Sequence, residues 1–217
     1  MRTASFSLLA ILCLLLSVAP AMANTVYDNG PYNGTNDAWT IDFGFTVSDS
    51  FTLTSGPVSE FHFVYWDASS SDVLTTADLQ LGTTSFGGSA TTVGFSNTFL
   101  GTNQYGYNLF QADATGLNIP WAGGAGFATL GNACSTSGCS VTTPIYWDEN
   151  SGPSTAYENT IGSIPSEAFT LTGTSCIPCG CGIRGPDCGG TPEPSSILLF
   201  GSGILGLVGM LRRKLGR

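Results

Sequence analysis

The chain has 217 residues, of which 42% are hydrophobic and only 10% are charged, and its formal net charge is −9 at pH 7. All fifteen acidic residues except Glu193 lie between Asn24 and Gly190, where Arg184 is the only arginine or lysine. A surface of this sign repels phosphate groups, so nucleic acids and anionic lipid surfaces are disfavoured as partners. The hydrophobic content also argues against an intrinsically disordered acidic chain.

The N-terminal residues have the organisation of a secretory signal peptide. Arg2 precedes an apolar run at residues 8–18, and Ala21 and Ala23 place small side chains at the two positions that a signal peptidase inspects. We therefore expect residues 1–23 to be removed and the mature, exported chain to begin at Asn24.

Residues 24–174 are predicted to form one all-β domain, a β-sandwich of jelly-roll-like type. Short stretches rich in aromatic and β-branched residues alternate with turn-forming residues, and we find no convincing amphipathic helix. Residues 39–47 alternate between apolar and polar positions, as a half-buried strand does. About nine strands are expected. The others are predicted around residues 61–66, 79–86, 92–100, 105–112, 126–130, 141–147 and 169–172.

A seven-residue pattern occurs near both ends of this domain. The sequence SDSFTLT at residues 48–54 resembles SEAFTLT at residues 166–172. Terminal strands of sandwiches often lie together, so the pattern predicts two neighbouring edge strands. Chance similarity in a chain rich in Ser and Thr is the alternative.

A second repeated pattern supplies the candidate ligand site. Tyr-Trp-Asp occurs twice, each time at the end of a predicted strand. An aromatic ring can pack against the C–H face of a sugar while a nearby carboxylate accepts hydrogen bonds from hydroxyl groups or binds calcium. The alternative is that the aromatic residues belong to the core and that each Asp begins a turn. The candidate residues are Tyr65, Trp66, Asp67, Tyr146, Trp147 and Asp148.

Enzymatic motifs are not apparent, and we expect no catalytic residue. The single histidine, His62, lies between Phe61 and Phe63 on a predicted strand and is expected to be structural. Asp148 and Glu149 are a candidate glycosidase pair, but adjacent strand residues point to opposite faces and cannot flank one glycosidic bond unless the strand ends first.

Metal binding has little support in the sequence, and we predict no metal site and no cofactor. Asp28, Asn29, Asp37 and Asp42 gather oxygen ligands near the mature N-terminus and make calcium the one cofactor to consider. Solvated turn residues explain the same four positions without an ion.

Six cysteines follow the signal peptide, an even number that predicts disulfides in an exported chain. Six cysteines allow fifteen pairings. Cys134 and Cys139 flank a short loop that a disulfide between them could close, and three pairings of the others remain if they do. Residues 175–190 form a segment rich in Cys, Gly and Pro that is too short to bury a core, so disulfides are expected to hold it. Zinc binding is the alternative for its four cysteines. They are Cys176, Cys179, Cys181 and Cys188.

Residues 191–217 have three parts in a fixed order. Pro192, Glu193 and Pro194 come first, an apolar run of residues 197–211 follows, and a basic cluster of Arg212, Arg213 and Lys214 comes last. The run is short for a bilayer span, although residues 195–196 and the flexible basic side chains extend its reach. Basic residues remain on the cytoplasmic side, so we expect residues 24–196 to be exported.

These three parts in order resemble the PEP-CTERM sorting signal. In that family the signal is read by an exosortase, a membrane-embedded processing enzyme, so the resemblance implies removal of the tail near Pro194 and a location at the cell surface or outside the cell. Residues 27–34 and 144–152 are also similar to segments of uncharacterised PEP-CTERM proteins of acidobacterial type. That similarity supplies no catalytic or binding residue.

The sequence thus predicts four parts: a signal peptide at 1–23, a β-sandwich at 24–174, a stalk at 175–190 and a sorting signal at 191–217. The expected function is that of a structural component of the cell surface or extracellular matrix. Binding of an extracellular polysaccharide by the two Tyr-Trp-Asp segments is the first alternative, and cleavage of a glycan is the second.

Overall fold

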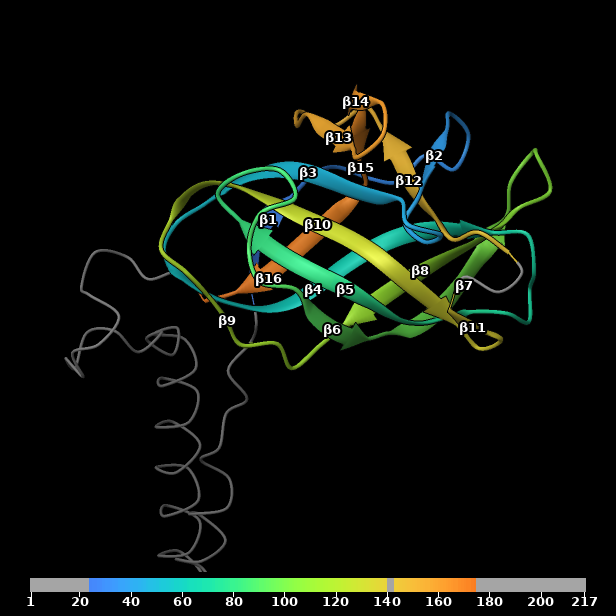
Figure 1. Ribbon diagram of the computed structural model, residues 1–217, viewed down its shortest axis with the longest axis horizontal. Helices are drawn as coiled ribbons and strands as arrows, with labels where there is room; N and C mark the ends of the chain where they lie inside the picture. The colour runs from blue at the N-terminus through green and yellow to red at the C-terminus, as the bar shows by residue number, and fades with distance from the viewer. Residues whose placement is uncertain (1–23, 140–142, 175–217) are drawn as a thin grey trace, which may run out of the picture. The chain divides into compact units, whose positions relative to one another are not determined.

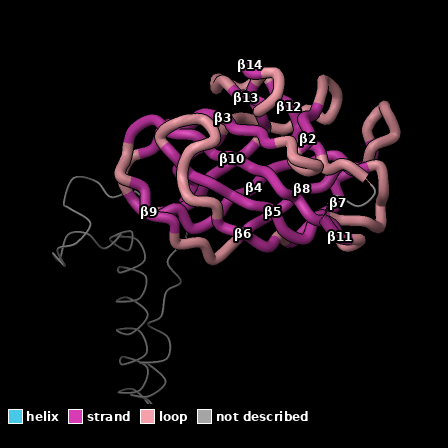
Figure 2. The backbone as a smooth tube through the Cα atoms, viewed as in Figure 1, coloured by secondary structure: helices cyan, strands magenta, loops and turns pink. Residues whose placement is uncertain are grey.

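The computed structural model describes residues 24–139 and 143–174, and this part of the chain contains strands, turns and loops but no helix (Figures 1 and 2). The strands form two antiparallel sheets that pack face to face, so the predicted all-β sandwich is confirmed. The predicted signal peptide, cysteine-rich stalk and sorting signal lie outside the described residues.

One sheet has nine strands. Its path runs β1-β16-β4-β12-β15, with β8 and β9 also pairing with β4, β7 with β8, and β2 with β12. The strands are β1 (Asn24–Asp28), β2 (Ala38–Thr40), β4 (Gly56–Asp67), β7 (Ser96–Thr102), β8 (Asn108–Ala114), β9 (Ile119–Trp121), β12 (Tyr146–Asn150), β15 (Ser166–Glu167) and β16 (Phe169–Gly173).

The other sheet has seven strands in the order β14-β13-β3-β10-β5-β6, with β11 paired to β10. Its longest strand, β10, lies between β3 and β5. The strands are β3 (Thr46–Leu53), β5 (Leu74–Gly82), β6 (Thr91–Gly94), β10 (Gly124–Ser135), β11 (Gly138–Cys139), β13 (Ala156–Glu158) and β14 (Gly162–Ile164).

The core lies between the two sheets and follows from alternation along the strands. In β4, Phe61, Phe63 and Tyr65 are at most 2% exposed, while Glu60 and His62 point to the other face. Leu79 of β5 and Leu130 of β10 face them from the opposite sheet with no exposed surface. Burying each of these large side chains stabilises the fold by about 1.5–3 kcal/mol.

The strand predicted at residues 39–47 was wrong. The chain forms β2 up to Thr40, turns at residues 41–45 and begins β3 at Thr46. The N–H of Phe45 donates to the carbonyl of Asp42, and Phe43 and Gly44 have φ angles of 53° and 88°. Such positive φ angles do not occur in a strand, so apolar alternation here accompanies a turn with exposed aromatic rings.

The repeated pattern at 48–54 and 166–172 does not mark neighbouring edge strands. Its first copy forms β3, which lies between β13 and β10, and its second copy contains β16, which lies between β1 and β4. The two copies are therefore interior strands of opposite sheets. They nevertheless meet at one point, because the N–H of Glu167 donates to Oδ2 of Asp49 over 2.7 Å.

Candidate functional site

The two Tyr-Trp-Asp segments lie side by side. β4 and β12 pair antiparallel, with Trp66 opposite Tyr146 and Tyr65 opposite Trp147. Tyr65 and Trp147 have no exposed surface and Trp66 is only 5% exposed. The prediction that both tryptophan rings offer a face to a sugar is therefore wrong, because the rings are packed inside the protein.

Trp147 is a central residue of the core. Its ring centroid lies 5.7 Å from those of Phe63 and Phe169, and its indole N–H donates to the carbonyl of Ala168 over 2.9 Å. Edge-to-face packing and a satisfied indole N–H are the requirements of a buried tryptophan. The residue therefore organises the meeting of β4, β12 and β16.

The carboxyl group of Asp148 connects β12 to β4 and to the loop that precedes β2. It accepts hydrogen bonds from Nε1 of Trp66 (2.5 Å), from the N–H of Asn33 (3.0 Å) and from the N–H of Gly34 (2.9 Å). Burial raises its pKa to about 6. Asp148 is therefore a buried structural acceptor.

Asp67 is buried as well, but its carboxyl group is only partly satisfied. Oδ1 accepts from the N–H of Ser69 over 2.7 Å, whereas Oδ2 has no hydrogen-bond partner among the described residues. Burial raises the pKa of Asp67 to about 6. Asp67 and Asp148, the aspartates of the two segments, therefore have structural roles. Tyr146 is half-buried and packs against the ring of Tyr107.

A second acidic cluster lies where the two copies of the repeated pattern meet. Oδ2 of Asp49 accepts from Nδ2 of Asn29 and from Oγ of Ser154, both over 2.9 Å. Glu167 is fully buried, and neither oxygen of its side chain has a partner among the described residues. Burial, together with the charge of Asp49, raises the pKa of Glu167 well above its usual value. Burial also raises the pKa of Asp49 to about 6.

The four residues considered for calcium are not gathered around a common point. Asn29 belongs to the Asp49 cluster, and Asp42 accepts a hydrogen bond from the N–H of Ile145 at a different place. Asp28 and Asp37 bind backbone N–H groups of their own turns. Within residues 24–139 and 143–174, no three His, Cys, Asp or Glu side chains are arranged to hold a metal ion.

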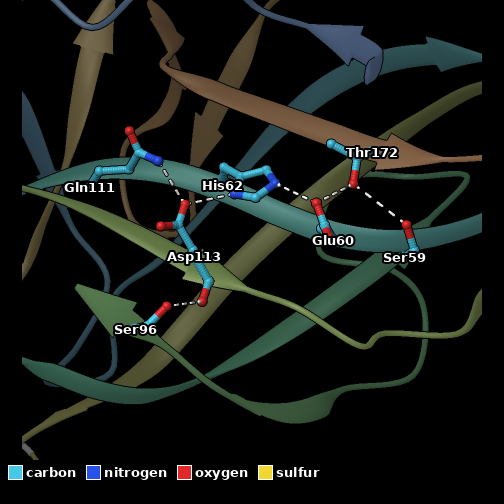
Figure 3. A network of polar contacts seen from close by, with 7 residues as sticks. All are labelled: Ser59, Glu60, His62, Ser96, Gln111, Asp113 and Thr172. Atoms are coloured by element: carbon cyan, nitrogen blue, oxygen red, sulfur yellow. Dashed lines mark hydrogen bonds and ion pairs between the residues drawn. The ribbon is translucent and has the colours of Figure 1, made fainter. Parts of the chain in front are cut away.

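A polar network on the outer face of the nine-stranded sheet surrounds the single histidine (Figure 3). Nδ1 of His62 lies 2.7 Å from Oδ1 of Asp113 on β8, and Nε2 lies 3.1 Å from Oε2 of Glu60 on β4. Nε2 of Gln111 donates to the same oxygen of Asp113, and the hydroxyl of Thr172 donates to Glu60. His62 therefore has the satisfied position that the sequence predicted, at the centre of a network that crosses β16, β4 and β8.

The same network forms part of a surface groove with a volume of about 470 Å³. Its floor includes His62, Gln111 and Thr170 from three neighbouring strands, and Pro31 and Tyr32 line it from the loop after β1. This groove was not predicted from the sequence. The available signal was the run of polar residues at alternate positions, Glu60 and His62 on β4 and Gln111 and Asp113 on β8, but pairing between the strands is not visible in the sequence.

Of the predicted disulfides, one falls within the described residues and is confirmed. Cys134 and Cys139 are joined by a bond of 2.06 Å and close the hairpin between β10 and β11. The remaining four cysteines lie outside the described residues, and so do Ala21 and Ala23. Asn24, the predicted first residue of the mature chain, is the first residue of β1.

No described segment forms a helix with the length and apolar character needed to cross a membrane. The predicted anchor, residues 195–211, lies outside the described part of the chain. Residues 27–34 and 144–152 lie within the described part of the chain, and their resemblance to acidobacterial proteins stays a prediction.

Comparison with known proteins identifies the C-terminal residues. No curated protein matches the chain. Residues 191–214 match the family model of the PEP-CTERM protein-sorting motif, and this match includes the three residues of the Pro-Glu-Pro motif and the basic residues 212–214. The motif implies export, anchoring in the membrane and processing by an exosortase. The chain is thus a PEP-CTERM sorting domain-containing protein with a β-sandwich body.

Proposed function

We propose that this protein is a non-catalytic structural component of the cell surface or extracellular matrix, released from its membrane anchor when an exosortase cuts near Pro194. The match of residues 191–214 to the sorting motif carries the proposal. The signal peptide at residues 1–23 directs the chain to the exporting system, and the basic residues 212–214 hold the tail on the cytoplasmic side until cleavage.

The β-sandwich has properties that are typical of exported proteins. A disulfide closes the end of β10, and such bonds persist in oxidising compartments. The two sheets enclose a continuous aromatic core, and the described residues include thirteen Asp and Glu side chains with no Lys or Arg. A net negative surface favours solubility and keeps the body away from anionic membranes.

The intact mass of the protein produced in its own host tests this function. The protein is recovered from the cell-surface and medium fractions and alkylated with and without reduction. We expect a chain that begins at Asn24 and ends near Pro194, with its cysteines blocked from alkylation until reduced. A surface protein that retains residues through Arg217 contradicts the processing step.

Two variants make this test specific. Replacing Pro192, Glu193 and Pro194 with alanine should prevent cleavage and leave the full tail on the protein. Pro186→Ala changes a proline that lies outside the matched residues and should leave processing unchanged. Equal processing of both variants would contradict a role for the motif.

A further inference from the structure

We propose that the groove across β16, β4 and β8 binds a neutral saccharide chain through fixed polar side chains on its floor and the ring of Tyr32 at its rim. This site differs from the two Tyr-Trp-Asp segments, which are buried. The inference rests on the proposed function only because export places the groove where extracellular glycans are met.

The floor of the groove presents polar groups from neighbouring strands in a row. Thr170 of β16 lies opposite His62 of β4, and His62 lies opposite Asp113 of β8. Two residues further along, on the same face of the sheet, Gln111 lies opposite Val64. Side chains at paired positions of a sheet stand about 5 Å apart, so they can contact separate hydroxyl groups of one sugar ring or of adjoining rings.

The polar groups of the floor are held in place before any ligand arrives. His62 is fixed on both sides by Asp113 and Glu60, and Gln111 is fixed by its bond to Asp113 over 2.8 Å (Figure 3). Groups that are already ordered lose little conformational entropy when a ligand binds. The network therefore supplies a preorganised surface.

Several atoms of this network keep hydrogen-bonding capacity for a ligand. Oε1 of Gln111, a residue that lines the groove, accepts none of the hydrogen bonds of this network, and neither do Oδ2 of Asp113 and Oε1 of Glu60, the two residues that hold His62. All three are acceptors, and the hydroxyl groups of a saccharide are donors that complement them. The hydroxyl of Thr170 adds a group that can either donate or accept.

The wall of the groove is a firmly attached loop. Nδ2 of Asn150 donates to the carbonyls of Asn29, Gly30 and Pro31, and the N–H of Asn29 donates to the carbonyl of Phe169 over 2.9 Å. Tyr32 extends from this loop with 43% of its surface exposed. An exposed tyrosine ring beside polar groups offers the apolar face against which the C–H side of a sugar packs.

Charge selects a neutral ligand. The described residues contain no Lys or Arg, and Asp28, Glu60 and Asp113 lie in or beside the groove. An anionic ligand such as a uronate or phosphate ester would meet repulsion without a compensating cation. A metal ion is not favoured either, because no three ligating side chains within the described residues are arranged for one. The groove volume of about 470 Å³ suits a short stretch of a sugar chain.

Affinity electrophoresis tests the proposal on the full chain, kept in a detergent that has no sugar headgroup. Dextran, galactomannan, xyloglucan and β-1,3-glucan serve as neutral probes, and alginate serves as the anionic probe. We expect at least one neutral polysaccharide to slow migration and alginate to have no effect. Failure of all four neutral probes, or stronger retardation by alginate, overturns the proposal.

Variants locate the binding to the groove. Gln111→Ala and Tyr32→Ala should each weaken binding by about tenfold or more, in line with the loss of a hydrogen bond or an aromatic contact at a binding site. Gln80→Ala is the matched control, since Gln80 is a half-buried glutamine on β5 of the other sheet. Unchanged binding by both groove variants overturns the proposal, as does an equal loss in the Gln80 control.

Two further measurements distinguish a failure of the groove from a failure of the fold or of processing. Thermal unfolding of each variant shows whether the loss of binding reflects a loss of fold, and we expect the groove variants to unfold within a few degrees of the wild type. If the full chain binds a neutral probe but the protein recovered from its own host still carries its tail through Arg217, the groove assignment holds and the proposed processing is contradicted. If the protein is correctly processed in its host but binds none of the neutral probes, the proposed processing holds and the groove assignment is contradicted.

Discussion

The indole N–H of Trp66 donates a hydrogen bond of 2.5 Å to Oδ1 of Asp148, which joins the first Tyr-Trp-Asp segment to the second. Trp66 is on β4 and Asp148 is on β12, and both side chains are at most 5% exposed. The two copies of the pattern thus form one structural unit. The two segments are therefore paired parts of one sheet and not two separate ligand sites.

The bond between Trp66 and Asp148 should be measurable as a coupling. Trp66→Phe and Asp148→Ala should each lower the free energy of unfolding by about 1–3 kcal/mol, because each leaves a buried polar group without its partner. The double variant should be less destabilised than the sum, with a coupling of about 1 kcal/mol. Urea denaturation of the four proteins gives these values, and strict additivity would contradict the coupling.

Trp147 should be among the residues whose replacement is most damaging. It has no exposed surface and lies against Phe61, Phe63 and Phe169. Trp147→Ala should lower the free energy of unfolding by about 3–5 kcal/mol through lost burial and the cavity left behind. Denaturant melts of this variant and of Tyr105→Ala, which removes a ring that is 56% exposed, provide the comparison. Similar destabilisation of the two variants would contradict the placement of Trp147 in the core.

Stability should fall as the pH rises from about 4 to above 6. Burial raises the pKa values of four aspartates to about 6 and that of Glu167 well above its usual value. The folded state therefore binds more protons than the unfolded state in this window, and the contribution of these groups is fully present only below their unfolded pKa values. A shift of one pKa unit is equivalent to about 1.4 kcal/mol. The four aspartates are Asp42, Asp49, Asp67 and Asp148.

Thermal melts at pH 4.5 and pH 8 measure this effect, and we expect the higher melting temperature at pH 4.5. Glu167→Gln keeps the shape of the protonated side chain and removes the charge that forms at high pH, so it should raise stability at pH 8 and reduce the difference between the two melts. Hydrogen bonds from Thr92 and Asn132 lower the pKa of Asp78, which limits the gain at still lower pH. A melting temperature that rises from pH 4.5 to pH 8 would be incompatible with the buried acids described above.

The disulfide between Cys134 and Cys139 should contribute modestly. The two cysteines are five positions apart, so the bond closes a short loop. By lowering the conformational entropy of the unfolded chain, it adds about 2 kcal/mol to the free energy of unfolding. The double replacement of Cys134 and Cys139 by serine should lower the unfolding free energy by that amount while leaving the sandwich folded. The near-ultraviolet circular dichroism spectrum of the variant serves as the control for folding, and an unfolded spectrum would show a larger role than loop closure explains.

The fold class could be predicted from the sequence because strand formation depends on local composition and alternation. Residues 61–66 form part of β4 and residues 169–172 form most of β16, as their aromatic and β-branched residues predicted. The turn at residues 41–45 was missed because Phe43 and Phe45 preserve the alternation although their side chains are exposed by 42% and 39%. Alternation records which positions are apolar, not whether the backbone is extended.

The site was less predictable, because it depends on contacts between distant strands. The burial of Trp66 and Trp147 follows from the pairing of β4 with β12, which are about eighty residues apart. The groove joins Tyr32, His62 and Gln111 from three separate segments, and no spacing within any one of them indicates the others. The sorting signal could be recognised from the sequence alone, because its three parts follow one another along the chain.

The interior position of β16 has a mechanical consequence. The chain leaves the nine-stranded sheet at Gly173, at the end of a strand that is hydrogen-bonded to β1 on one side and to β4 on the other. A pull along the axis of β16 loads both ladders in shear, so many hydrogen bonds must break together. An edge strand would peel away one bond at a time. Tension along this strand is thus borne by hydrogen bonds on both of its sides.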